Sequence, residues 1–226
     1  MGTAAADLLA SLRGAGLLSS SVIPSDFTPS LLLNVRFPGT DADTCHGTLM
    51  RVSQVQSAPV LSVAPLNSAL ATTTTTTTTT TTKTFTLLMI DPDAPTPDDP
   101  KFAYWRHWVV ANISLPATAE TKDETGSGSG SGSGKGAQLQ LDECTSGARV
   151  LTPYLAPGPK DESRPHRYLF LLFAEPDGFR PEKGDVGGDE FVQRRSFPAD
   201  EFVRRHGLRL VAAQWMLGAG DGWREE

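Results

Sequence analysis

The stretch Lys83-Thr-Phe-Thr-Leu-Leu-Met-Ile90 runs directly into Asp91-Pro-Asp-Ala-Pro95, and the rest of the chain can be arranged around this junction. The first part is short and apolar, which predicts a strand, and the prolines of the second part end it. Another strand is expected at 104–113, where Trp105 and His107 share one face by the period of two. Because the polar residues lie where loops meet apolar strands, we expect them to meet in one small pocket.

A second segment of the same kind follows later in the chain. Gly158-Pro159 predicts a loop, and the next apolar strand begins with His166 and Tyr168 on one face. Glycine lets an anion approach backbone N–H groups, and Tyr and His supply directed donors. A histidine titrates at about pH 6.5, so it suits a phosphate either as imidazolium or as a neutral donor. Taken alone, each segment also fits an ordinary turn beside a core strand.

Together, the two segments resemble the hallmarks of the phosphatidylethanolamine-binding protein family, also called the Raf kinase inhibitor or carboxypeptidase Y inhibitor family. Its Asp-Pro-Asp-x-Pro and Trp-x-His stand here as Asp91–Pro95 and Trp105–His107. Its Gly-Pro and His-Arg-Tyr stand here as Gly158–Pro159 and His166–Tyr168. The resemblance is to a fungal-type member, and it extends from about Phe27 to Trp215 once low-complexity inserts are skipped.

The resemblance implies a pocket for a small anion, such as the phosphate of a phospholipid head group. Carried over by position, the ligand-binding residues are Asp91, Pro95, Trp105, His107, Gly158, Pro159, His166 and Tyr168. In this pocket, Asp91 is expected either to orient a histidine or to accept from the ammonium group of ethanolamine. The resemblance also implies binding without catalysis, with no cofactor and no metal, and a protein partner such as a peptidase or a kinase.

Three departures from the family pattern affect the pocket. Phe102 stands where animal members have a tyrosine, so one hydroxyl contact is expected to be absent. The charged loop Lys160–Arg164 replaces a loop rich in Pro and Gly. The chain after Trp215 is too rich in glycine to form the C-terminal helix that borders the animal pocket. A more open pocket is therefore expected.

Two alternatives to a phosphate-binding protein stay open. The first is an inhibitor of a serine carboxypeptidase or a kinase, with the pocket as a lipid switch and residues 1–26 or a loop in the target's active site. Removing residues 1–26 would then abolish inhibition and leave anion binding intact. The second is an enzyme with a metal held by Asp91, His107 and His166. The sequence shows neither metal-ligand spacing nor an activated nucleophile, so we do not expect an enzyme.

Composition excludes other classes of function. The 226 residues carry a net charge of −6 without a Lys/Arg cluster, which argues against a nucleic-acid partner. No run approaches the roughly 18 apolar residues of a transmembrane segment. Residues 1–18 lack the pattern of a secretory signal, so a cytoplasmic location is expected. The two cysteines, Cys45 and Cys144, do not predict a disulfide framework.

The overall pattern favours a mainly β fold, an antiparallel two-sheet sandwich with a few short peripheral helices. Strands outnumber helices and do not alternate with them, which disfavours a doubly wound α/β sheet. Besides the strands at 83–90 and 104–113, strands are expected at 31–37, 59–63, 166–173 and 208–217, and helices at 7–13 and 198–206.

The sequence predicts a single domain with added low-complexity segments. The predicted parts are an N-terminal arm with a short helix at 1–26, the domain at 27–217 and a flexible tail at 218–226. Eleven threonines at 72–82 have no apolar face to bury, and the alternating Gly and Ser at 126–134 are typical of a flexible linker. The segments at 72–82 and 120–147 are therefore expected to be loops within the one domain.

Overall fold

The computed structural model describes residues 3–40, 43–66, 83–115, 137–139, 141, 147–188 and 190–225. Its strands are β1 (Leu31–Arg36), β2 (Thr48–Arg51), β3 (Val60–Pro65), β4 (Thr84–Asp91), β5 (Trp105–Ser114), β6 (Ala137–Gln138), β7 (Arg149–Thr152), β8 (His166–Ala174) and β9 (Arg209–Ala219). Its α-helices are α1 (Thr3–Gly14) and α3 (Ala199–Arg205). Three 3-10 segments are η1 (Val52–Gln54), η3 (Lys183–Val186) and η4 (Phe191–Arg194).

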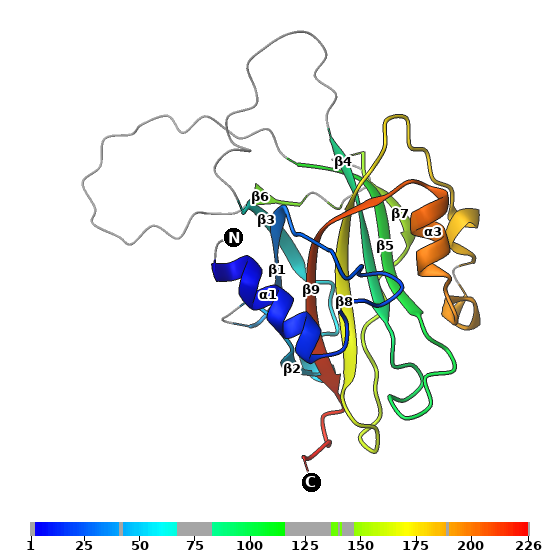
Figure 1. Ribbon diagram of the computed structural model, residues 1–226. Helices are drawn as coiled ribbons and strands as arrows, with labels where there is room; N and C mark the ends of the chain where they lie inside the picture. The colour runs from blue at the N-terminus through cyan, green and yellow to red at the C-terminus, as the bar shows by residue number, and fades with distance from the viewer. Residues whose placement is uncertain are drawn as a thin grey trace.

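Two sheets form the sandwich that the sequence predicted (Figure 1). The larger sheet has six strands in the order β2-β9-β8-β4-β5-β7, and the smaller has three in the order β1-β3-β6. Neighbouring strands are antiparallel, apart from the parallel pair of β2 and β9. Strands β4 and β8 lie at the centre of the larger sheet.

The central strand β4 is apolar at nearly every position because both of its faces are covered. Leu87 and Met89 belong to the core between the two sheets. Leu88 and Ile90 point the other way, into a second core that the N-terminal segment and α3 cover. The period of two explains this division, and burial on both faces explains the unbroken apolar run.

Helix α1 packs on the larger sheet, where it covers part of β9 (Figure 1). Leu8, Leu12 and Leu17 are buried in the second core, and Trp215 Nε1 of β9 donates to Ser11 Oγ at 3.1 Å. The N-terminal segment is therefore part of the core. Because of this packing, we now expect removal of residues 1–26 to disturb the fold that holds the pocket, unlike the expectation from the sequence.

The predicted strands agree with the observed ones to within two residues at each end, whereas β2, β6 and β7 were not predicted. Strand β6 falls inside the loop expected at 120–147. The two repeats and Cys144 lie outside the described residues, and Cys45 is a free, exposed cysteine. In the part of the chain that the structure describes, no helix has the length and apolar character needed to cross a membrane.

The residues after β9 pack against β2 and against the loop Lys160–Arg164, called the rim loop below. Arg51 donates to the carbonyl oxygens of Gly220 and Trp223, both at 2.9 Å. The backbone N–H of Gly222 donates to Asp161 Oδ1 at 2.9 Å. A Cβ atom at Gly220 would lie 2.1 Å from that same oxygen, so this close approach needs glycine. The boundaries proposed for arm, domain and tail stay predictions.

Candidate ligand-binding site

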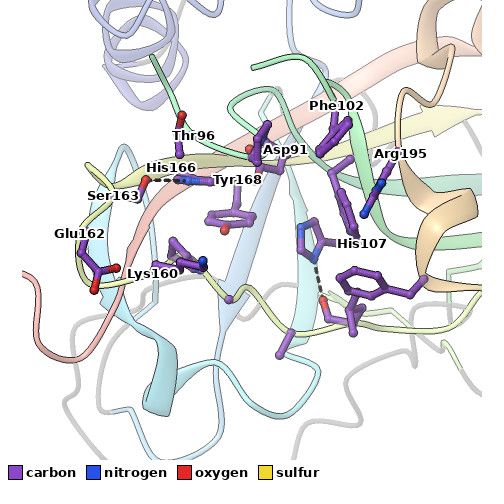
Figure 2. A pocket seen from close by; sticks show the side chains of 18 residues that line it. Asp91, Thr96, Phe102, His107, Lys160, Glu162, Ser163, His166, Tyr168 and Arg195 are labelled. Atoms are coloured by element: carbon purple, nitrogen blue, oxygen red, sulfur yellow. Dashed lines mark hydrogen bonds and ion pairs between the residues drawn. The ribbon is translucent and has the colours of Figure 1, made fainter. Parts of the chain in front are cut away.

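A pocket of about 480 Å³ opens where β4 ends and β5 and β8 begin (Figure 2). Strand pairing brings these ends together, because Asp91 lies opposite Trp105 and Ile90 lies opposite Leu169. All eight residues predicted from the sequence line the pocket: Asp91, Pro95, Trp105, His107, Gly158, Pro159, His166 and Tyr168. Their shared location is a structural result, and their role in binding a ligand stays a prediction.

Sequence reasoning missed six other pocket-lining residues, which are Ala94, Thr96, Leu155, Ala156, Phe191 and Arg195. It had noted Phe102 and the loop Lys160–Arg164 as departures that affect the pocket, and Lys160, Glu162 and Ser163 of that loop line it. Phe191 and Arg195 come from a distant part of the chain and belong to no motif. Arg195 lies over the ring of Phe102 at 4.4 Å and over that of Trp105 at 5.8 Å. A cation therefore lies beside the aromatic wall of the pocket.

Asp91 orients His166, which is one of the two roles expected for it. Oδ2 of Asp91 lies 2.9 Å from Nδ1 of His166, and both side chains are buried. Oδ1 accepts the backbone N–H of Asp93 at 2.6 Å, which fixes the carboxylate. Because a carboxylate can only accept, Nδ1 of His166 carries the hydrogen.

The other nitrogen of His166 is also in contact with the protein. Nε2 lies 3.1 Å from Oγ of Ser163, a contact that Figure 2 shows as a dashed line. The same Oγ donates to the carbonyl oxygen of Arg164 at 2.9 Å. Ser163 precedes His166 by only three residues, yet no sequence motif identified it as part of the site.

His107 has one nitrogen bound to the protein and one free for a ligand. Nδ1 lies 2.7 Å from the carbonyl oxygen of Leu155, which can only accept, so Nδ1 carries the hydrogen. Burial lowers the pKa of His107, and Asp91 opposes part of this shift. His107 is therefore neutral at neutral pH, and its Nε2 presents a lone pair towards the interior of the pocket (Figure 2). It must take up a proton before it can donate to an anion there, which corrects the expectation that the neutral form donates to a phosphate.

Tyr168 lies between the two histidines. Its ring centre is 5.2 Å from that of His107 and 6.2 Å from that of His166. Burial raises the pKa of Tyr168 well above its usual value, and the charges of Asp91 and Asp93 raise it further. The side chain is therefore a neutral phenol, able both to donate and to accept a hydrogen bond.

Trp105 and Gly158 both line the pocket, and each has an unusual environment. Trp105 Nε1 is buried and has no hydrogen-bond partner among the described residues. Its ring packs edge to face against Phe191, with ring centres 4.8 Å apart. A Cβ atom at Gly158 would meet no atom within 4 Å, so the protein itself leaves the space beside this glycine open.

The metal-enzyme alternative is not supported by this geometry. In the described segments, no group of three or more His, Cys, Asp or Glu side chains is arranged to hold a metal ion. Asp91 and His166 bind each other, and Nδ1 of His107 faces a carbonyl oxygen.

Known proteins share the sequence pattern and the fold of this chain. The chain is 28% identical over 208 residues to the carboxypeptidase Y inhibitor of Saccharomyces cerevisiae, an alignment that covers 88% of this chain and 89% of the inhibitor. The fold is similar to that of carboxypeptidase Y inhibitor in complex with its cognate proteinase, with a TM-score of 0.71, 21% identity and 97% of both chains covered.

A phosphatidylethanolamine-binding protein from Plasmodium vivax has a similar fold, with a TM-score of 0.65, 15% identity and coverage of 94% of this chain and 97% of that one. The model of the family described as phosphatidylethanolamine-binding protein matches residues 38–218, which include both motifs and every predicted pocket residue. The chain therefore belongs to the phosphatidylethanolamine-binding protein family.

Proposed function

We propose that this protein binds a small phosphate-bearing ligand, such as a phospholipid head group, and that the occupied pocket modulates a protein partner. The observation that carries the proposal is the convergence of Asp91, His107, His166 and Tyr168 on one pocket of about 480 Å³. These groups supply directed donors and acceptors of hydrogen bonds. The proposal assigns binding, not a reaction, and a cytoplasmic location stays a prediction.

The chemistry of the pocket suits a phosphate group that is singly protonated or that is joined to an ammonium group. The phenol of Tyr168 can donate to a phosphate oxygen. The Nε2 lone pair of His107 can accept from a singly protonated phosphate, or it can take up a proton and donate. Asp91 keeps a negative charge close by, which favours the zwitterion phosphorylethanolamine over an anion without an ammonium group.

The pocket is connected to an apolar surface that a partner can contact. Phe191 lines the pocket, yet it is 60% exposed, and its neighbour Val192 is 59% exposed. Large exposed apolar side chains that lie together are typical of interaction sites. Because Phe191 belongs to both surfaces, a ligand in the pocket changes what a partner meets outside it.

A titration with phosphate and with phosphorylethanolamine tests the binding proposal. Histidine ring resonances would be followed by NMR in the wild type, His107→Ala and His166→Ala. Saturable shifts of both rings in the wild type, weakened in each variant, are expected. Silent spectra from a folded wild-type protein would refute the proposal.

A serine carboxypeptidase inhibitor is the second candidate function. It is favoured by the similarity to the yeast carboxypeptidase Y inhibitor, which extends over 88% of this chain. No observation favours a kinase over a peptidase as the target. Hydrolysis of a peptide by carboxypeptidase Y, measured with increasing amounts of this protein, tests the idea. If the pocket is a switch, added phosphorylethanolamine changes inhibition by the wild type and not by His166→Ala. Undiminished hydrolysis at micromolar protein would eliminate this candidate.

A further inference from the structure

The rim loop holds the hydroxyl of Ser163 against His166. Ser163 is 7% exposed, and its backbone N–H donates to the carbonyl oxygen of Lys160 at 3.1 Å, which closes a turn. Together with the Asp91 contact, the Ser163 contact leaves neither ring nitrogen of His166 free for a ligand. The protein itself therefore satisfies one of the principal polar groups of the pocket.

The positions of the hydrogens follow from groups that can only accept. Asp91 needs the hydrogen on Nδ1 of His166, and the carbonyl oxygen of Arg164 needs the hydroxyl hydrogen of Ser163. The third contact is then made by a hydrogen on Nε2 of His166 that points to Oγ of Ser163. This direction is opposite to that in a serine hydrolase, where the hydroxyl gives its hydrogen to the histidine.

We propose that Ser163 is a specificity-determining residue of the pocket, because its hydroxyl occupies the Nε2–H donor of His166 until a ligand displaces it. This inference rests on the proposed function, since it names how that same pocket selects its ligand. With a hydrogen on both nitrogens, the ring of His166 carries a positive charge, so a phosphate oxygen adds an attraction between opposite charges that the neutral Oγ of Ser163 lacks. A phosphate oxygen therefore displaces Ser163, whereas a neutral hydroxyl or amide ligand gains nothing by the exchange.

Contacts on both sides of Ser163 brace the rim loop. Asp161 accepts from the backbone N–H of Gly222 at 2.9 Å. Arg164 forms an ion pair with Asp98 at the surface. Displacing Ser163 requires the loop between these contacts to move or its hydroxyl to rotate, so the rim loop contributes to the cost of binding.

A double-mutant cycle tests this role with inorganic phosphate as the probe. Dissociation constants would be measured by NMR for the wild type, Ser163→Ala, His166→Gln and the double variant. Ser163→Ala is expected to bind phosphate about 3- to 10-fold more tightly, the range for releasing one internal hydrogen bond. The gain is expected to vanish in the His166→Gln background. Ser62→Ala is the matched control and is expected to bind like the wild type, because Ser62 is a partly buried serine on β3 whose hydroxyl contacts Asn34.

The possible outcomes separate this proposal from the proposed function. If the wild type binds phosphate and Ser163→Ala binds equally or more weakly, Ser163 is not a competitor, and only this inference is overturned. If Ser163→Ala still tightens phosphate binding in the His166→Gln background, the effect does not depend on the Nε2 donor of His166, and this inference is overturned. If the wild type and Ser163→Ala are both folded and neither binds phosphate, the proposed function fails, and this inference fails with it.

Discussion

Nη2 of Arg167 lies 2.6 Å from Oδ1 of Asp93, and this partly buried contact ties the motif after β4 to β8. Asp93 also accepts from the Nε and the backbone N–H of Arg167, at 2.9 and 2.7 Å. The remaining arm of the guanidinium donates to the carbonyl oxygen of Ala15 at 2.8 Å. Arg167 lies between His166 and Tyr168 in sequence and points to the opposite face of the strand. The two pocket residues are thus held in place from behind.

Breaking this ion pair should destabilise the fold. Arg167→Met leaves the carboxylate of Asp93, which is only 3% exposed, without its partner. Because Arg167 itself is one-third exposed, we expect a loss of about 2 to 3 kcal/mol in the free energy of unfolding, below the full cost for a completely buried pair. Urea unfolding measures it. Arg164→Met, which breaks the exposed pair with Asp98, is the matched control and should change nothing measurable. Equal effects of the two variants would contradict the argument.

Anion affinity should rise as the pH falls, because His107 must take up a proton to donate to an anion. Sulfate is the appropriate probe, since it keeps the same charge between pH 5.5 and 8, whereas phosphate changes its own charge. If one proton is bound with the ligand, affinity increases by at most about tenfold for each unit of pH. Calorimetric titrations at four pH values test this, and His107→Gln should remove the part that His107 contributes. A pH-independent sulfate affinity in the wild type would contradict the tautomer assigned to His107.

The pH dependence of folding stability tests the lowered pKa of His107 without any ligand. The pKa of His107 is lowered in the folded protein, so the unfolded chain binds a proton more readily than the folded one. The contribution to stability is therefore complete above the unfolded pKa of about 6.5 and is lost as the pH falls below it. His107→Gln should reduce this acid sensitivity in urea unfolding experiments at pH 7.5 and 5.5.

His166→Ala should weaken anion binding by about 1 to 3 kcal/mol, the usual range for one charge-assisted hydrogen bond. The reason is that the donor on Nε2 disappears and Asp91 loses the group it orients. Phosphate titration followed by NMR gives the value. His46→Ala removes an exposed histidine outside the pocket and should bind like the wild type. Unchanged affinity in folded His166→Ala would count against the pocket assignment.

Truncating the buried face of α1 should destabilise the whole domain. Leu12 is fully buried, so Leu12→Ala is expected to cost about 2 to 5 kcal/mol in the free energy of unfolding. Leu9 lies only partly buried at the edge of the same core, and Leu9→Ala should cost clearly less. Thermal unfolding of both variants tests the ranking. If Leu12→Ala melts like the wild type, the N-terminal segment is not part of the cooperative unit.

Removing either repeat should leave the fold and phosphate binding nearly unchanged. The threonines at 72–82 and the Gly-Ser repeat at 126–134 have no apolar pattern to bury, and shortening a long loop changes its closure entropy little. Thermal unfolding and a phosphate titration of each deletion variant check this. A melting temperature lowered by more than a few degrees would show that one of the repeats contributes to the folded domain.

The sequence best predicted those strands whose buried faces follow from the local pattern of apolar residues. In β4 the apolar run is unbroken because two cores cover the strand, and the prolines after Asp91 mark its end. The two motifs likewise predicted that His107 and His166 meet in one pocket, because both lie near the start of a strand. Short edge strands such as β6, only two residues long, carry no such pattern, because their pairing depends on a partner far away in sequence.

The parts of the site that the sequence did not predict depend on contacts between distant segments. Phe191 reaches the pocket only because η4 packs beside Trp105. The neutral state of His107 depends on burial and on the carbonyl oxygen of Leu155, neither of which has a local signal. The contact between Nε2 of His166 and Ser163 depends on the shape of the rim loop. Residue identity therefore predicted which groups meet, and the fold determined which of their hydrogens are available.

The pairing of β4 with β5 has a consequence for inherited variation. Asp91 pairs with Trp105 at the pocket, and Thr84 pairs with Ser114 at the other end of the two strands. At about 3.3 Å per residue, these ends lie about 23 Å apart. In the sequence the threonine repeat precedes Thr84 and the Gly-Ser repeat follows Ser114, and these two strand ends lie at the pole remote from the pocket. Alleles that differ in the number of repeats are then expected to encode the same pocket.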